Sequence, residues 1–165
     1  MRRAVYWSLL STPTAGVTYG AHGLWSWQRK PGQEPPEHKG TGVAPTWREA
    51  MDLPGSTHMK YAAELFTSLP WWQLRPYQEL LVAQPGGDDP AKHVAAAWSD
   101  NGDLAVIYLP AGGEVCLKTD RLVEGLKVEW FDPRTGKRRA ARDNEGKYRA
   151  PDEDDWVLVF RRPEK

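Results

Sequence analysis

The periodicity of apolar residues changes near residues 69–77, and this change most constrains the possible fold. From about residue 3 to residue 70 the pattern predicts a helix, a strand, a loop and further helix. After about residue 80, short apolar runs alternate with turns, which is typical of antiparallel sheet. A single helix-strand-helix unit cannot bury both faces of its strand, because such a strand needs neighbours on both edges. Residues 1–70 are therefore expected to be a piece of a larger structure.

The first half begins with a predicted helix over residues 3–11, where apolar residues recur on one helical face before Pro13. A predicted strand follows over residues 16–19. Residues 28–45 are rich in proline and glycine and predict an irregular loop.

Helix is predicted to resume at Thr46, because Thr46 and Glu49 have the spacing of a capping box. Pro54 and Gly55 are expected to break this helix, and a second helix is expected over residues 56–68. The buried face of that second helix is predicted from apolar residues three, four and seven apart. These residues are Met59, Ala62, Ala63 and Phe66.

The second half predicts six or seven short strands, an arrangement that suggests a small β-sandwich. The predicted strands cover residues 93–98, 104–109, 114–119, 127–131, 137–142 and 156–161. Asn101-Gly102 can supply the positive dihedral angles of a tight hairpin turn between the first two. DPRTG, residues 132–136, predicts a turn that proline initiates and glycine closes.

Charge and composition limit the possible partners. Lys plus Arg and Asp plus Glu are 22 each, so no net charge draws the chain to nucleic acid or to an anionic membrane. No apolar run approaches the roughly 18 residues of a membrane span. A single cysteine, Cys116, cannot form an internal disulfide and is expected to be a buried, inert thiol. Nine tryptophans provide amphipathic rings, which suit sugar-binding surfaces as well as half-buried core positions.

Several stretches, in order along almost the whole chain, resemble one family. They are RRAVYWSLLSTPTAGVTYGAHGLWSW, TWREAMDLPGSTHMKYAAELFTSLPWWQLRP, AVIYLPAG, VEWFDPRTG and DWVLVF. They resemble the C-terminal part of apiosidase-like glycoside hydrolases, in which a TIM barrel precedes a small β-domain labelled a collagen-binding domain of a collagenase. The most specific part is WFDPRTG followed by DWVLV.

The resemblance implies an α+β fold: a partial (β/α) barrel segment (helix-strand-helix), residues 1–75, followed by a small antiparallel β-sandwich, residues 76–165. Residues 16–20 would be the last barrel strand. The family's catalytic carboxylates lie on earlier strands, before Met1, so no catalytic residue is assigned to this chain. The expected function is that of a C-terminal fragment of a glycoside hydrolase, inactive without its missing N-terminal barrel portion. Whether the chain is itself an enzyme is left open.

Barrel active sites lie at the C-terminal ends of the strands, so the stretch VTYGAHGLWSW would line the active-site mouth. Tyr19, His22, Trp25 and Trp27 are the predicted substrate-binding residues, because indole faces stack on sugar rings and Tyr and His orient hydroxyls. The alternative is that both tryptophans pack inward from one face of a strand. The expected partner is an oligo- or polysaccharide.

Other polar groups are given structural interpretations. Residues 152–155 are all acidic but lack the spacing of a calcium loop, so a solvated turn is expected, with Asp155 fixing the start of the last strand. The basic residues 137–139 are expected on an exposed strand. The spacing of His38 and His58 provides no zinc site. No metal and no cofactor are predicted.

Two further functions remain open for the second half. It could be a stand-alone module that binds carbohydrate or a matrix protein, with Trp130 in the site, although no residue supports collagen as the partner. It could instead only brace the barrel, and its signature would be buried Trp130 and Trp156 facing the helix that contains Phe66 and Trp71. The resemblance implies a secreted or periplasmic parent protein. Tyr6 and Trp7 interrupt the only stretch that imitates a signal peptide, so the compartment is left open.

Overall fold

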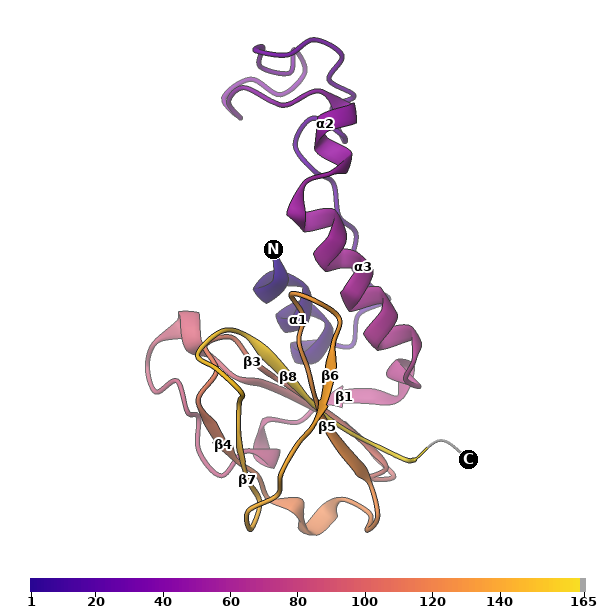
Figure 1. The fold of residues 1–165 in the computed structure, drawn as a ribbon, viewed down its shortest axis with the longest axis vertical. Coiled ribbons are helices and arrows are strands. Elements are labelled where there is room, and N and C mark those ends of the chain that lie inside the picture. The colour runs from indigo at the N-terminus through magenta and orange to yellow at the C-terminus, as the bar shows by residue number, and fades with distance from the viewer. Residues whose placement is uncertain (164–165) are drawn as a thin grey trace.

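The computed structural model describes residues 1–163, and these form three α-helices and eight β-strands (Figure 1). The helices are α1 (Arg2–Ser11), α2 (Trp47–Met51) and α3 (Pro54–Thr67). The strands are β1 (Leu74–Pro76), β2 (Ala95–Ser99), β3 (Leu104–Leu109), β4 (Glu114–Cys116), β5 (Lys127–Phe131), β6 (Arg138–Ala140), β7 (Lys147–Arg149) and β8 (Trp156–Arg161). Residues 164 and 165, the end of the predicted β-domain, lie outside the described residues.

Six strands form one antiparallel sheet in the order β1-β2-β3-β8-β5-β6, and β4 pairs with β7 in a second sheet. The predicted α+β class is confirmed, and residues 1–163 contain no closed barrel. The predicted strands over 114–119 and 137–142 shorten to β4 and β6. The sequence does not predict β1 and β7, because three residues are too few to show an alternating pattern.

The β2–β3 hairpin forms as predicted, but its turn differs in detail. Gly102 adopts a φ of +72°, whereas Asn101 does not enter the left-handed region. The connection spans four residues, 100–103, so it needs only one positive φ instead of the two of a type I′ turn.

Side chains alternate between the two faces of the large sheet, and both faces are covered (Figure 1). One face packs against α1 and α3. It presents Ala95, Ala97, Leu104, Val106, Tyr108, Phe131, Val157 and Val159. The opposite face packs against the β4-β7 sheet and its flanking turns. It presents Ala96, Ala105, Ile107, Leu109, Trp130, Trp156, Leu158 and Phe160. The central strands β3 and β8 are consequently buried along almost their whole length.

The prediction that Trp130 and Trp156 face the helix containing Phe66 is wrong. Phe66 belongs to the core on the helix-covered face, while both tryptophans belong to the core on the other face. Trp130 is also buried, so its ring is not available to stack on a ligand at the surface of the β-domain. Strand alternation decides this, because the neighbouring Phe131 takes the helix-facing position.

The helices largely follow the predicted boundaries. The capping box before α2 is confirmed: Thr46 Oγ1 accepts from the Glu49 N–H, and the Glu49 carboxylate accepts from the Thr46 N–H at 2.8 Å. α3 begins at Pro54 and not at residue 56, because proline in the first turn sacrifices no helical hydrogen bond. Its buried residues are Ala62, Leu65 and Phe66. Ala63, predicted to be buried, is exposed.

The predicted strand over residues 16–19 is wrong: this segment forms no ladder with another strand. A strand needs a neighbour whose backbone groups pair with its own, and the described residues place none beside it. The loop over residues 28–45 is confirmed as irregular, apart from one isolated bridge between Gln33 and Ala44.

Polar contacts join the first seventy residues to the sheet. The Trp7 indole N–H donates to the His93 carbonyl at 2.9 Å. Arg138 donates to the Ser68 hydroxyl at the end of α3 and forms an ion pair with the buried Glu129. The sequence predicted only that residues 137–139 lie on an exposed strand. Arg138 in addition connects β6 to the end of α3 and to the buried Glu129.

The acidic segment before β8, residues 152–155, was predicted to be a solvated turn, but it forms ion pairs and hydrogen bonds with the rest of the chain. Arg134, in the DPRTG turn, forms ion pairs with Asp132, Asp152 and Asp154. Burial would raise the pKa of Asp132, but hydrogen bonds from Arg134 outweigh it and hold the pKa below its ordinary value. The Trp156 indole N–H donates to Asp152 at 2.7 Å. These contacts explain why the turn and the closing strand occur together in one motif.

Candidate functional site

The predicted substrate-binding residues lie on residues 19–27, here called the aromatic loop, which leads toward the end of the molecule occupied by α2 (Figure 1). Its backbone forms consecutive turns. The Ala21 carbonyl accepts from Leu24 and Trp25, and the Gly23 carbonyl accepts from Gln28 at 2.8 Å. Gly23 has a φ of +94°, and a Cβ there would lie 2.3 Å from the Pro45 carbonyl oxygen. Only glycine allows the loop to pack this closely.

Trp25 and His22 belong to one group of rings. The Trp25 ring lies 6.2 Å from the His22 ring and 4.0 Å from the His38 ring, which meets it edge-on at 67°. Trp25 nevertheless remains 45% exposed. From the sequence, His38 was assessed only as a possible metal ligand. Its contact with Trp25 arises from the fold of the 28–45 loop.

Trp27 belongs to a second group. Its ring stacks on Trp47 at 4.7 Å with an interplanar angle of 7°, and the Arg48 guanidinium lies 4.4 Å from the Trp47 ring centre. Trp27 is 53% exposed and has a φ of +50°, which is unusual for a residue other than glycine. The Trp47 N–H donates to the Gln28 carbonyl at 2.8 Å, which holds the first turn of α2 against the loop. The alternative in which both tryptophans pack inward is therefore wrong.

Tyr19 packs elsewhere. It is half-buried, and its hydroxyl lies so near Gly55 in the first turn of α3 that a Cβ at Gly55 would be 2.2 Å away. The structure thus places His22 with Trp25, Trp27 with Trp47, and Tyr19 against α3. Sequence reasoning missed Trp47, although the capping box at Thr46 already marked the point where this residue enters a helix.

Two polar atoms of the aromatic loop are buried without a partner among the described residues: His22 Nε2 and Ser26 Oγ. A buried, unpaired polar atom costs about 1–3 kcal/mol and calls for an explanation. Both atoms lie next to the exposed tryptophans in the chain, where a ligand or another segment could supply the missing hydrogen bonds.

Two acidic residues near the loop, Glu34 and Glu49, have structural partners. The Glu34 carboxylate accepts from the Gly42 N–H at 2.9 Å, and Glu49 closes the capping box. Thr46 hydrogen bonds accordingly lower the pKa of Glu49. Glycoside hydrolysis requires two carboxyl groups held opposite each other. The hydrogen bonds of Glu34 and Glu49 do not hold either side chain opposite a second carboxylate.

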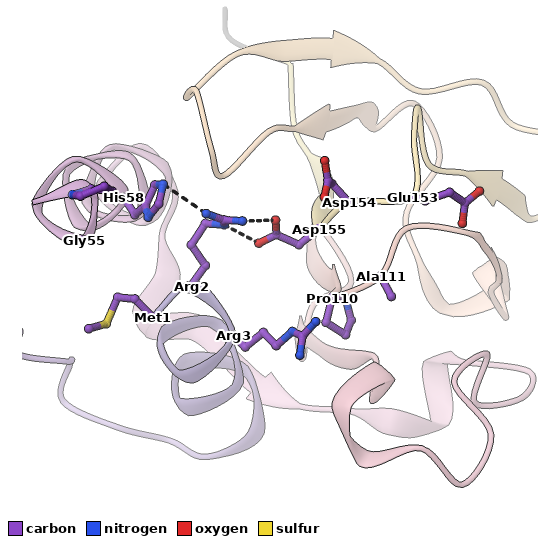
Figure 2. Close-up of a pocket in the computed structure, with 11 residues that line it drawn as sticks. Met1, Arg2, Arg3, Gly55, His58, Pro110, Ala111, Glu153, Asp154 and Asp155 are labelled. Atoms are coloured by element: carbon purple, nitrogen blue, oxygen red, sulfur yellow. Dashed lines mark hydrogen bonds and ion pairs between the residues drawn. The ribbon is translucent and has the colours of Figure 1, made fainter.

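A pocket of about 620 Å³ lies between the N-terminal ends of α1 and α3 and the loops at 110–111 and 153–155 (Figure 2). Arg2 crosses it, donating to both Asp155 carboxylate oxygens at 2.7 and 2.8 Å and to His58 Nε2 at 3.1 Å. Burial and the neighbouring Arg2 guanidinium hold the pKa of His58 below its ordinary value. Because the Arg2 guanidinium can only donate, His58 Nε2 accepts this hydrogen bond.

The Arg2–Asp155 pair confirms the structural role predicted for Asp155. None of the four predicted substrate-binding residues lines this pocket. We therefore regard it as a polar junction between the helices and the sheet.

Two general features bear on the kind of site. Within residues 1–163, no group of His, Cys, Asp and Glu side chains is arranged to hold a metal ion. No helix among the described residues has the length and apolarity needed to cross a bilayer.

Comparison with solved structures shows where this fold occurs. A glycoside hydrolase family 5 crystal structure from Bacteroides vulgatus matches 99% of this chain with a TM-score of 0.80 at 20% identity. A second structure, described as a glycoside hydrolase, matches 99% with a TM-score of 0.74, also at 20% identity. The chain spans 36% of the length of each. The fold is thus one that occurs within glycoside hydrolases.

The family comparison is more specific. Residues 76–161 match the family described as "Putative collagen-binding domain of a collagenase", and the chain belongs to this family. Residues 1–73 match the family described as "Apiosidase-like, catalytic domain". No curated protein matches the sequence. The chain is therefore glycoside hydrolase-related at the level of family, and the resemblance seen in its sequence is confirmed.

Proposed function

We propose that this chain is the C-terminal part of a glycoside hydrolase that acts on plant or microbial polysaccharide, with the aromatic loop as one wall of the substrate site. The observation that carries the proposal is the pair of exposed indoles, Trp25 and Trp27, each held in place by neighbouring rings. Exposed, immobilised rings stack on sugar faces with little loss of side-chain freedom. His22 would pair its buried Nε2 with a substrate hydroxyl or a neighbouring barrel segment.

An apolar groove between α1 and α3 supports a barrel context for residues 1–75. It is lined by Val5, Leu9, Val17, Met59, Ala62, Ala63, Phe66 and Trp71, among others. Exposed apolar surface of this kind is commonly covered by another segment or partner. In our proposal further barrel elements cover it, and residues 76–165 form a β-domain that braces the barrel through the helix-facing side of the large sheet.

In this proposal, the acid and the nucleophile or base come from outside these 165 residues, and the chain alone is inactive. To test this, the chain is incubated with cellulose, xylan, arabinan and galactan while released reducing sugar is measured. We expect no release by the chain alone. Sequencing the DNA upstream of the Met1 codon should find barrel strands with paired carboxylates. Hydrolysis by the isolated chain would overturn the assignment of catalysis to another segment.

The substrate-site assignment is tested separately by a glycan array. Trp25→Ala and Trp27→Ala should each weaken oligosaccharide binding by about tenfold, since each removes a stacking surface. Trp72→Ala is the matched control, because Trp72 is 63% exposed but lies outside the aromatic loop. Equal loss in all three variants, or none in the first two, would contradict the assignment.

A further inference from the structure

A second pocket lies on the β-domain between two short 3₁₀ turns, η2 (Gln78–Leu80) and η4 (Thr119–Arg121). We call it the Tyr77 pocket. Its lining side chains are Tyr77, Glu79, Lys118, Asp120 and Arg121. Its volume, about 440 Å³, lies within the usual range for small-molecule sites. In Figure 1, η4 is the orange turn at the bottom, opposite α2 along the long axis, so the pocket is separate from the aromatic loop.

The tyrosine ring in this pocket is held in a fixed orientation. It stacks on Trp98 with ring centres 4.3 Å apart and an interplanar angle of 18°. Its hydroxyl accepts a hydrogen bond of 2.8 Å from the Arg121 guanidinium. The Tyr77 N–H donates to the Ala96 carbonyl at 2.8 Å, which ties the residue to strand β2. The ring is therefore held in place, with Trp98 against one face and the Arg121 guanidinium 5.9 Å from the ring centre. A ligand that packs against the part of the ring left open need not order it.

The backbone on both sides of the pocket is also fixed. The Lys118 N–H donates to the Leu80 carbonyl at 2.8 Å, and Leu81 and Leu117 form an isolated bridge. The turn of the β2–β3 hairpin presses against η4: a Cβ at Gly102 would lie 2.4 Å from the Arg121 carbonyl oxygen. Backbone hydrogen bonds and close packing thus hold the two turns that carry the charged side chains next to each other.

The charges of the lining residues indicate the chemical class of ligand. Glu79 and Asp120 accept hydrogen bonds, while Lys118 and Arg121 donate them, so the pocket offers both kinds of partner with balanced charge. A phosphate or uronate would meet two carboxylates, and a polycation would meet two cationic groups. A neutral polyol instead donates through its hydroxyl hydrogens, accepts through its oxygens, and presents C–H faces to an aromatic ring.

We propose that the Tyr77 pocket binds one or two residues of a neutral saccharide, giving the β-domain a sugar-binding site of its own. Tyr77 would be the stacking platform, and the four charged side chains would bind the hydroxyls. The site lies at the opposite end of the molecule from the aromatic loop and does not require catalysis. It therefore stands whether or not the proposed function is correct.

The test is a titration of the full chain with cellohexaose and xylohexaose, monitored by NMR and calorimetry, with polygalacturonate and inorganic phosphate as anionic comparators. Glu79→Gln and Asp120→Asn keep the shape of exposed side chains, so both variants should fold. Each should weaken binding of the neutral sugar by about tenfold, the effect of losing one charged acceptor. Glu124→Gln, at an exposed carboxylate outside the pocket, is the matched control and should bind like the original chain.

Shifts of the Tyr77 and Trp98 ring signals on adding either neutral hexasaccharide would support the proposal. Three results would overturn it: no binding of either hexasaccharide at about 10 mM, a concentration that reveals even millimolar sites; binding of the anionic comparators only; or sugar binding that Trp25→Ala abolishes and both pocket variants leave intact. The last result would refute this site while supporting the aromatic loop as the substrate site.

Discussion

The carboxylate of Asp155 provides the sharpest test of how the helices are joined to the sheet. Asp155 is 5% exposed and accepts two hydrogen bonds from Arg2 and one of 3.1 Å from the buried Tyr108 hydroxyl. Asp155→Asn keeps the shape but removes the charge and one acceptor. Removing one partner of a fully buried ion pair costs about 3–5 kcal/mol.

The Arg2 side chain is 27% exposed, so water can solvate part of the stranded guanidinium, and the expected loss is nearer about 2 kcal/mol. For a chain of this size, that loss lowers Tm by about 4–8 °C. Urea unfolding at neutral pH, monitored by circular dichroism, measures the loss in the free energy of unfolding, and a thermal scan measures the shift in Tm. The same mutation one residue earlier, Asp154→Asn, is the control.

The Asp154 side chain is 69% exposed, so losing its ion pair with Arg134 should cost less than about 1 kcal/mol. In the double mutant Arg2→Gln/Asp155→Asn, the two losses should be clearly less than additive, because each single change already breaks the same pair. Equal effects of Asp154→Asn and Asp155→Asn, or additive losses in the double mutant, would refute the reasoning.

Two further changes test the fold. Gly136→Ala should destabilise by more than about 2 kcal/mol, because Gly136 has a φ of +72° and a Cβ would lie 2.7 Å from the Tyr61 ring. Gly125→Ala, with a φ of +76° but open space, should cost only about 1 kcal/mol, and equal losses in urea unfolding would argue against the Tyr61 contact. Burial would raise the pKa of Glu129, but hydrogen bonds from Lys127, Arg161 and Arg138 outweigh it and lower the pKa. The stability this group contributes is therefore present above its ordinary pKa of 4.5 and is lost as pH falls through the lower folded value. Urea unfolding from about pH 6 to about pH 3 should show a weaker pH dependence for Glu129→Gln, and an unchanged dependence would contradict this.

Local signals in the sequence predicted much of the sheet. β2, β3, β5 and β8 follow from alternation and from turn residues, which act over a few neighbouring positions. The capping box at Thr46 was predicted for the same reason. The strand over residues 16–19 was predicted wrongly, because a strand forms only where another segment pairs with it, and a local pattern does not reveal that segment.

For the candidate site too, some features were predicted from the sequence and others depend on the fold. Tyr19, His22, Trp25 and Trp27 were predicted as sugar-binding residues from residue type and the family resemblance, and this role remains a prediction. The fold alone shows that Trp27 stacks on Trp47 and that Tyr19 packs against Gly55. The Tyr77 pocket was not foreseen, because its lining residues fall in two separate stretches, 77–79 and 118–121, which meet only through η2 and η4.

The sequence by itself determined the capping box before α2, the antiparallel character of the second half and the family. Apolar spacing, capping residues and turn glycines act within a few positions along the chain, so they can be read without a structure. Only the tertiary structure decided which face of the sheet Trp130 and Trp156 occupy, which cation binds Asp155, and where exposed rings face solvent. These outcomes depend on the packing of distant segments, and the same side chain is a core residue or a binding surface according to what the fold places over it.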